Sequence, residues 1–157
     1  MTDACVSATT VVPASAEVVF SLLADPATHA AIDGTGRVRG PVDTGHLAAA
    51  GQVFRMAMHH EDHPDGDYET ANRVRVFHRP TAISWEAGYD AGGGELRFGG
   101  WIWRYDLTAV GESRTEVTLS YDWSAVPASV RQYLRFPPFQ PHHLHESLAR
   151  LAQLVAT

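Results

Sequence analysis

Lysine is absent from this chain of 157 residues, and all 12 of its basic residues are arginine. Without lysine, neither a lysine Schiff base nor a lysine general base can take part in any mechanism. The 18 acidic residues outnumber the basic ones, and the sequence holds no basic stripe that could follow a phosphate backbone. We therefore expect no nucleic acid among the partners of this protein.

Cysteine and long apolar runs are also scarce. Cys5 is the single cysteine, which leaves no intrachain disulfide and is typical of the reducing cytoplasm. No run of roughly 18 apolar residues occurs, so we expect no membrane span. The first ten residues show neither the basic nor the apolar segment of a signal peptide. The length is that of one domain, and we predict a single cytoplasmic domain over residues 1–157.

Aromatic residues alternate with polar ones between residues 101 and 123. With a turn at Gly111, the chain folds back so that four pairs face each other: Trp101 and Trp123, Trp103 and Tyr121, Tyr105 and Leu119, Leu107 and Val117. Because side chains alternate across a strand, one face of this hairpin is aromatic and the other is polar. Opposed aromatic pairs contribute about 0.2–1 kcal/mol each and favour this register. The aromatic face predicts either a packed core or the wall of a pocket for a flat apolar ligand.

Breaks and periodicity predict the other elements. A strand at 5–12 precedes two short helices, one over 16–24 capped by Ser15 and one that starts at Asp25-Pro26. Strands are then predicted at 37–43, 51–60, 68–79, 82–89, 96–109 and 114–123, an antiparallel meander. A final helix over about 141–155 carries an apolar stripe of Leu144, Leu148 and Leu151. We predict an α+β fold in which a curved seven-stranded antiparallel sheet grips a long C-terminal helix.

Three strings carry a resemblance to a known superfamily. They are PASAEVVFSLLADPATHAAID, VRVFHRPTAISWE and FPPFQPHHLHESLARLAQLV. Together with the element order, they make the chain similar to the START-like superfamily with its helix-grip fold, in particular the bacterial polyketide cyclase/dehydrase and lipid-transport branch. The resemblance implies a cavity between sheet and helix for a small hydrophobic ligand. It implies no single catalytic signature, so the function has to come from the site itself.

Strand registers predict where polar groups meet this cavity. Pairing 68–79 with 82–89 places Asn72 opposite Tyr89, Val74 opposite Ala87 and Val76 opposite Trp85, and parity adds His60 to the same inner face. A polar end is then expected at His60, Asn72, Tyr89, Trp101 and Trp123. The apolar end is expected at Phe54, Ile83, Leu107 and Val117, with His78 as its inward polar group. A bulge is predicted at Gly99-Gly100.

The candidate site residues follow from these registers. The candidate catalytic residues are His60, Tyr89 and Asn72. The candidate ligand-binding residues are Met56, Met58, Trp85, Trp101, Trp103, Tyr105, Tyr121, Trp123, Tyr133, Phe136 and His142. An apolar pocket with a few convergent polar groups is the usual form of a small-molecule site, and the last three residues of this set are expected near its mouth.

The nine histidines raise the question of a metal. His59 and His60 point to opposite faces of a strand, so both cannot bind one inward ion. His63 lies in an acidic turn that we interpret as solvated. His142 and His145 share a helix face, which is a workable spacing for two ligands. We nevertheless expect neither a metal nor another cofactor.

Three functions remain open from the sequence. The first is binding of a small hydrophobic molecule, aromatic or polyketide-like, by a non-catalytic carrier or sensor. The second is a cyclase or dehydratase that acts on such a molecule without a redox cofactor, with His60 as general base. The third is a structural or interaction domain whose interior is filled by side chains. The sequence fits a monomer or a homodimer equally well.

Overall fold

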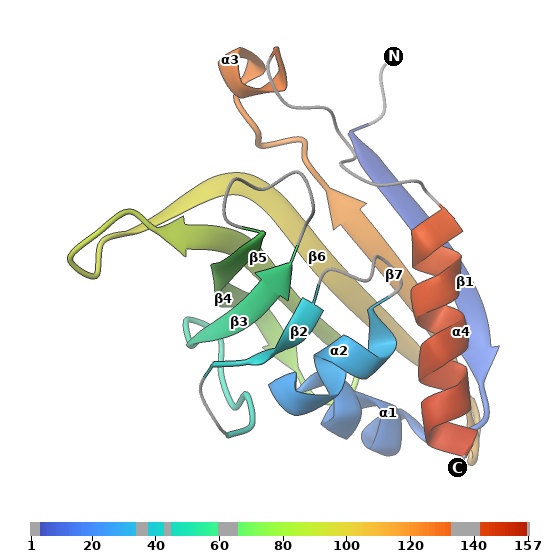
Figure 1. The fold of residues 1–157 in the computed structure, drawn as a ribbon. Coiled ribbons are helices and arrows are strands. Elements are labelled where there is room, and N and C mark those ends of the chain that lie inside the picture. Colours follow the sequence, from blue (N-terminus) through green and yellow to red (C-terminus); the bar gives the residue numbers. More distant parts are fainter. Residues whose placement is uncertain (1–3, 34–37, 43–44, 60–65, 133–141, 157) are drawn as a thin grey trace.

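The computed structural model describes residues 4–33, 38–42, 45–59, 66–132 and 142–156 (Figure 1). Seven strands form one antiparallel sheet in the order β1-β7-β6-β5-β4-β3-β2. The strands are β1 (Cys5–Val12), β2 (Val38–Pro41), β3 (Val53–His59), β4 (Asp67–His78), β5 (Ala82–Asp90), β6 (Leu96–Gly111) and β7 (Arg114–Asp122). The helices are α1 (Ala16–Leu23), the 3-10 turn η1 (Pro26–Thr28), α2 (His29–Ile32), α3 (Ala128–Arg131) and α4 (His142–Ala156). The predicted α+β class and seven-stranded sheet are confirmed.

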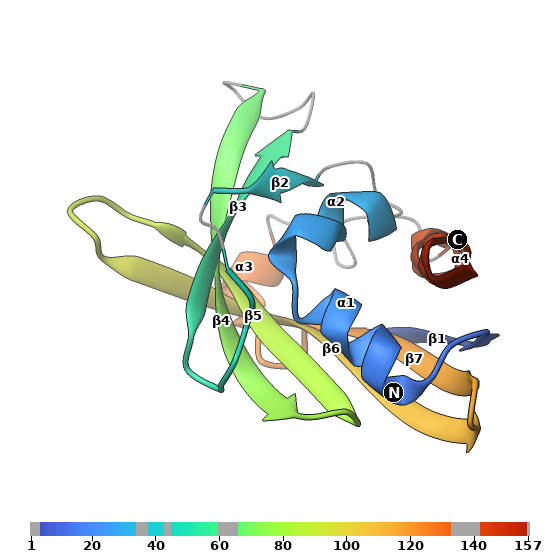
Figure 2. The ribbon, with the colours of Figure 1, turned by 90° about the horizontal axis from the view of Figure 1, so that it is seen from below.

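The short helices between β1 and β2 begin where the sequence places their caps. The Ser15 side chain accepts a hydrogen bond from the Val18 amide at 3.3 Å, and the Asp25 carboxylate accepts one from the Ala27 amide at 3.0 Å. Each bond satisfies an amide that the first helical turn would otherwise leave unpaired. Helix α1 buries the side chains of Val19, Phe20 and Leu23. Figure 2 shows the sheet curling around α1 and α2.

Helix α4 lies on the same side of the sheet as α1 and α2, against β1, β7 and α2 (Figures 1 and 2). Its apolar stripe is confirmed, because Leu144, Leu148 and Leu151 are all almost completely buried. Since α4 contacts the β1 edge rather than the middle of the sheet, the central strands receive their cover from other segments, α1 and α2 among them. None of the helices in the described ranges is long and apolar enough to cross a membrane.

The register of the β6–β7 hairpin follows the prediction from the aromatic pairs. Trp103 pairs with Tyr121, Tyr105 with Leu119 and Leu107 with Val117. The predicted bulge in β6 is also confirmed, because the β5–β6 register shifts between Glu86 and Gly88, which pair with Ile102 and Phe98. Within the bulge Gly100 has a φ of 98°, and a Cβ at this position would lie 2.8 Å from the carbonyl of Ala125. Glycine is required here for both reasons.

The predicted register between β4 and β5 is wrong. Asn72 pairs with Ala87 instead of Tyr89, and Val74 pairs with Trp85 instead of Ala87. The turn holds three residues, 79–81, instead of the predicted two, and a bulge between Val74 and Val76 adds a second shift. Each one-residue shift reverses which side chains face inward, so the two shifts together return Asn72 and Val74 to the predicted inner face.

Between the bulge and the turn only one shift applies. In that part of β4 the side chains predicted to face inward therefore face outward, and the others face inward. Phe77 points inward and packs edge-on against Phe20, with ring centroids 5.2 Å apart. His78, predicted as an inward group, is exposed. The predicted separation of a polar end from an apolar end also fails on the neighbouring strand, because Phe54 is the direct partner of Asn72.

Candidate functional site

Burial changes steadily along the inward face of β6. Leu107 and Tyr105 are only 4% and 6% exposed, whereas Trp103 and Trp101 are partly exposed. On the neighbouring strand β7, the inward Tyr121 is 3% exposed. The aromatic face predicted from the sequence therefore divides into two parts. It is core along β7 and at the turn end of β6, and a partly uncovered surface toward Trp101.

Two strands contribute to this uncovered surface. Trp85 of β5 is the direct cross-strand partner of Trp103, and it is partly buried as well. Trp101 continues the surface, and Gly99 allows its ring to lie on the backbone, because a Cβ there would overlap the indole. We call Trp85, Trp101 and Trp103 the indole patch. Behind it, the Trp103 ring packs against the buried Tyr121 ring with centroids 4.6 Å apart.

A buried histidine adjoins the indole patch. His29 of α2 is 9% exposed and stacks on Trp85, with ring centroids 5.0 Å apart and planes at 17°. Its Nε2 lies 2.9 Å from the carbonyl oxygen of Leu23, so Nε2 carries the proton and donates it to that oxygen. Burial lowers the pKa of His29, and the imidazole is neutral at neutral pH. Its Nδ1 lone pair is then the basic atom of the ring.

A phenol shares the Trp85 contact with this imidazole, and a carboxylate acts on both groups. Tyr105 packs against Trp85 with ring centroids 6.1 Å apart, and burial raises the pKa of its phenol, which therefore keeps its proton. The negative charge of Asp33 also raises the pKa of Tyr105. It raises the pKa of His29 as well, but by less than burial lowers it. One Asp33 carboxylate oxygen accepts a hydrogen bond from the Val38 amide at 3.0 Å. This bond holds the end of α2 beside the start of β2.

Asn72 is a further buried polar group on the inner face, at 5% exposed. Its Nδ2 donates to the Phe54 carbonyl at 3.5 Å and to the Thr70 hydroxyl at 3.2 Å. Both bonds use the amide nitrogen, which leaves Oδ1 as the atom able to accept from a ligand. Phe54 in turn contacts the rings of His29 and Trp85 edge-on, each at 5.6 Å. Asn72 and His29 are thus separated by one aromatic side chain.

Together these groups offer a defined chemistry. The indole patch supplies apolar, polarisable surface. Neutral His29 supplies a proton acceptor, Tyr105 a phenol that can donate a hydrogen bond, and Asp33 a negative charge that would stabilise a protonated imidazole. Such perturbed groups in an apolar setting are frequent at functional sites, although a buried histidine bonded to a carbonyl is also a common structural element.

The predicted catalytic residues do not assemble as expected. His60 lies outside the described residues, as do Tyr133 and Phe136. Tyr89 is 49% exposed and is not the partner of Asn72. Instead, it borders a surface cleft of about 330 Å³ together with Arg55, Glu69, Thr70, Ala71 and Asp90. The predicted mouth at 133–141 also lies outside the described residues, so the cavity between sheet and helix stays a prediction.

The other predicted ligand-binding residues have different degrees of burial. Met56, Tyr105, Tyr121 and Trp123 are buried core residues. Met58 borders a cleft of about 500 Å³ between β2, β3 and β4, lined also by Arg39, Ala57, Asp67, Tyr68 and Glu69. His142 is exposed at the start of α4. Among the predicted ligand-binding residues that the structure describes, Trp85, Trp101 and Trp103 form the partly uncovered indole patch.

His29, Asp33 and their contact with the sheet were not predicted from the sequence. The sequence offered one indication, the spacing of three residues between His29 and Ile32, which are both buried in α2. A single helical turn is too short for periodicity to identify its inward face. The stacking of His29 on Trp85 depends on how α2 lies over β5, which is a tertiary contact.

No protein-family model matches the chain. Over 131 residues, 83% of the chain, it is 27% identical to the uncharacterized protein Rv0088 of Mycobacterium tuberculosis. The match covers 52% of that protein, so the chain spans about half the length of this relative.

Solved structures match the fold over nearly the whole chain. Protein Ms6760 from Mycobacterium smegmatis is 15% identical with a TM-score of 0.67, covering 98% of this chain and 91% of the other. DynU16, a putative protein in the dynemicin biosynthetic locus, is 20% identical with a TM-score of 0.60, covering 99% of this chain and 48% of the other. The major latex-like protein 151 from Panax ginseng is 12% identical with a TM-score of 0.59, covering 96% and 93%. At these identities the likeness establishes the fold, which is a helix-grip fold, and not the activity.

Proposed function

We propose that this protein binds a small, flat, hydrophobic molecule, aromatic or polyketide-like, on the inner face of the sheet at the indole patch. The observation that carries the proposal is the partial exposure of Trp85, Trp101 and Trp103 on neighbouring strands of a largely buried face. Exposing three indoles to water is unfavourable unless something covers them. A flat ligand would stack on them, and the polar atoms of His29 and Asn72 would orient it.

The neighbouring proteins are compatible with this proposal. One of them belongs to a biosynthetic locus, that of dynemicin. This fact concerns that protein, and it supports the proposal only through the shared fold. The resemblance of the sequence to polyketide cyclases and lipid-transport proteins also supports a small hydrophobic ligand.

A fluorescent probe tests the proposed binding. N-phenyl-1-naphthylamine is neutral, flat and aromatic, and its emission rises when it leaves water. We expect saturable binding to the wild-type protein and at least about tenfold weaker binding to Trp103→Ala, which corresponds to about 1.4 kcal/mol. Phe98→Ala is the matched control, because Phe98 lies on the outer face under the guanidinium of Arg73 at 4.1 Å. Equal affinity of all three proteins, with Trp103→Ala still folded by circular dichroism, would place the ligand elsewhere or remove it altogether.

A second candidate function is catalysis by proton transfer at the same site. It is favoured by the neutral imidazole of His29 and the protonated phenol of Tyr105, which both pack against Trp85, and by the charge of Asp33. His60 remains the base predicted from the sequence, and His29 is the alternative that the structure adds. Native mass spectrometry of the purified protein would identify a bound molecule, whose conversion can then be followed. Replacing the true base, by His29→Gln or His60→Ala, should lower turnover by roughly 10²–10⁴ while leaving probe affinity within a few fold.

If the protein retains a molecule but does not convert it, the result would favour the first function, a non-catalytic carrier or sensor. A protein that retains no molecule and does not bind the probe would favour the third function, a domain filled by its own side chains.

A further inference from the structure

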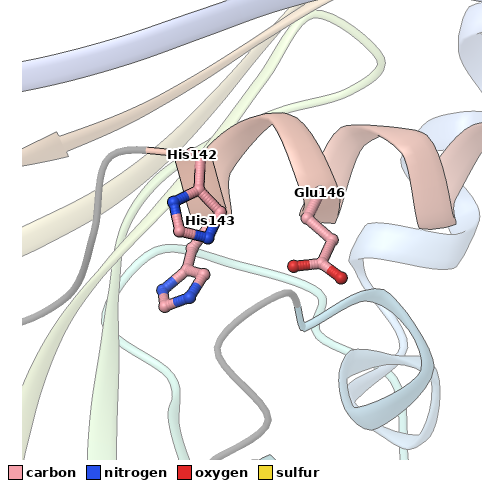
Figure 3. A group of neighbouring side chains, drawn as sticks. All are labelled: His142, His143 and Glu146. Carbon is pink, nitrogen blue, oxygen red and sulfur yellow. The ribbon is translucent and has the colours of Figure 1, made fainter.

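The first turn of α4 brings together three side chains that can bind a metal ion. His142, His143 and Glu146 each offer one ligand atom, and these atoms all lie within 4.8 Å of one another. Figure 3 shows the two imidazoles side by side, with the carboxylate of Glu146 one turn further along the helix. The ring centroids of the histidines are 4.5 Å apart. This group belongs neither to the indole patch nor to the His29 contacts.

The spacing explains why these three residues meet. Residues three and four apart lie on the same side of a helix, so Glu146 is within reach of both His143 and His142. His145, which the sequence analysis paired with His142, is not a member of the group. The structure thus groups His142 with His143 and the carboxylate of Glu146, instead of with His145.

We propose that His142, His143 and Glu146 form a surface site for a Zn²⁺-class divalent transition-metal ion, with water in the remaining position. Two imidazole nitrogens and one carboxylate oxygen are a donor set that suits zinc, and three protein ligands leave a place for water. Ligand atoms bound tetrahedrally to zinc, at bond lengths of about 2.0–2.2 Å, lie roughly 3.4 Å apart. The present separations, which are at most 4.8 Å, therefore need to close by no more than about 1.4 Å. Rotation of His142 and Glu146, which are exposed, allows this movement.

Two local features oppose the metal ion and set the expected affinity. Glu146 already pairs with Arg150 at 3.6 Å, with both side chains 46% exposed, so metal binding has to compete with this ion pair. The positive end of the α4 dipole lies at the same turn and disfavours a cation. An exposed ion pair is worth little, and the full negative charge of Glu146 exceeds the partial charge of the helix end. We therefore expect micromolar rather than nanomolar binding.

Titration calorimetry of the full chain with ZnCl₂ tests the site. The expected result is binding of one ion with a Kd below about 100 µM. His143→Ala and Glu146→Gln should each weaken binding about tenfold or more, whereas Arg150→Gln should strengthen it by removing the competitor of the metal. Two matched controls, His145→Gln and His59→Gln, should bind like the wild type. His145 is exposed on the same helix, and His59 lies 2.8 Å from Asp67 in a separate ion pair.

Each outcome decides for or against the proposal. The result overturns it if zinc binds no tighter than about 1 mM, or if His143→Ala and Glu146→Gln bind zinc like the wild type. A loss of binding in His59→Gln would assign the ion to the His59–Asp67 pair instead. Circular dichroism of each variant confirms that α4 is intact. If a variant has lost helix, its zinc titration is not used. The wild-type protein is then titrated with Co²⁺, because the cobalt absorption spectrum reports imidazole and carboxylate ligation directly.

Discussion

The buried imidazole of His29 should make this protein less stable as the pH falls through the range of histidine titration. Because burial lowers the pKa of His29, the unfolded chain, in which this group titrates near 6.5, binds the proton more readily than the folded protein. The stability contributed by the neutral ring is complete above pH 6.5. It is lost as the pH falls from there toward the lowered pKa of the folded state.

The size of the effect follows from one proton. The free energy of unfolding can change by at most about 1.4 kcal/mol per pH unit for a single group. Carboxylates have ordinary pKa values near 4, so the interval between pH 5 and 7 isolates the histidines. His29→Gln is the informative variant, because the glutamine amide nitrogen can replace Nε2 as donor to the Leu23 carbonyl, 2.9 Å away in the wild type. His78→Gln is the control, because His78 is exposed at the end of β4.

Urea unfolding at half-unit steps from pH 5 to 8 measures this contribution. We expect the wild type and His78→Gln to lose stability in parallel below pH 6.5. The loss should be shallower in His29→Gln, by up to about 1.4 kcal/mol per pH unit. Identical slopes in all three proteins would refute the argument, since they would mean that His29 binds its proton equally well in the folded and unfolded states.

Three further substitutions test the packing by urea unfolding at neutral pH, with Val110→Ala, 48% exposed, as a control that should change stability by less than about 0.5 kcal/mol. Leu148→Ala should cost about 2–5 kcal/mol, because Leu148 is 1% exposed between α4 and the sheet. Gly100→Ala should cost more than about 1 kcal/mol through its positive φ and the approach to Ala125. Thr115→Val should cost about 1–3 kcal/mol, because the buried hydroxyl donates to the Ala14 carbonyl at 2.8 Å. A cost within the range of the control at any of these sites would contradict the packing described there.

The strands, the helices and one register were determined by the sequence alone. Alternation of aromatic and polar residues across 101–123 is a local signal, and a tight turn transmits it directly to the pairing of Trp103 with Tyr121. The glycines at 99 and 100 identified the bulge for a similarly local reason, since a glycine pair within a strand breaks the ladder. The leucine stripe of α4 lies on a helix of 15 residues, long enough for its period to be recognised.

The site was decided by the tertiary structure. The bulge near Val74 is marked by no glycine in the sequence. Together with the longer turn, it moved Asn72 away from Tyr89 and into register with Ala87. His29 acquires its lowered pKa and its contact with Trp85 only when α2 lies on β5. Burial of an ionisable group and stacking between distant segments depend on neighbours that the chain brings together by folding. Local sequence patterns therefore predicted the sheet and its aromatic face, whereas contacts between elements determined which part of that face stays uncovered and which histidine lies beside it.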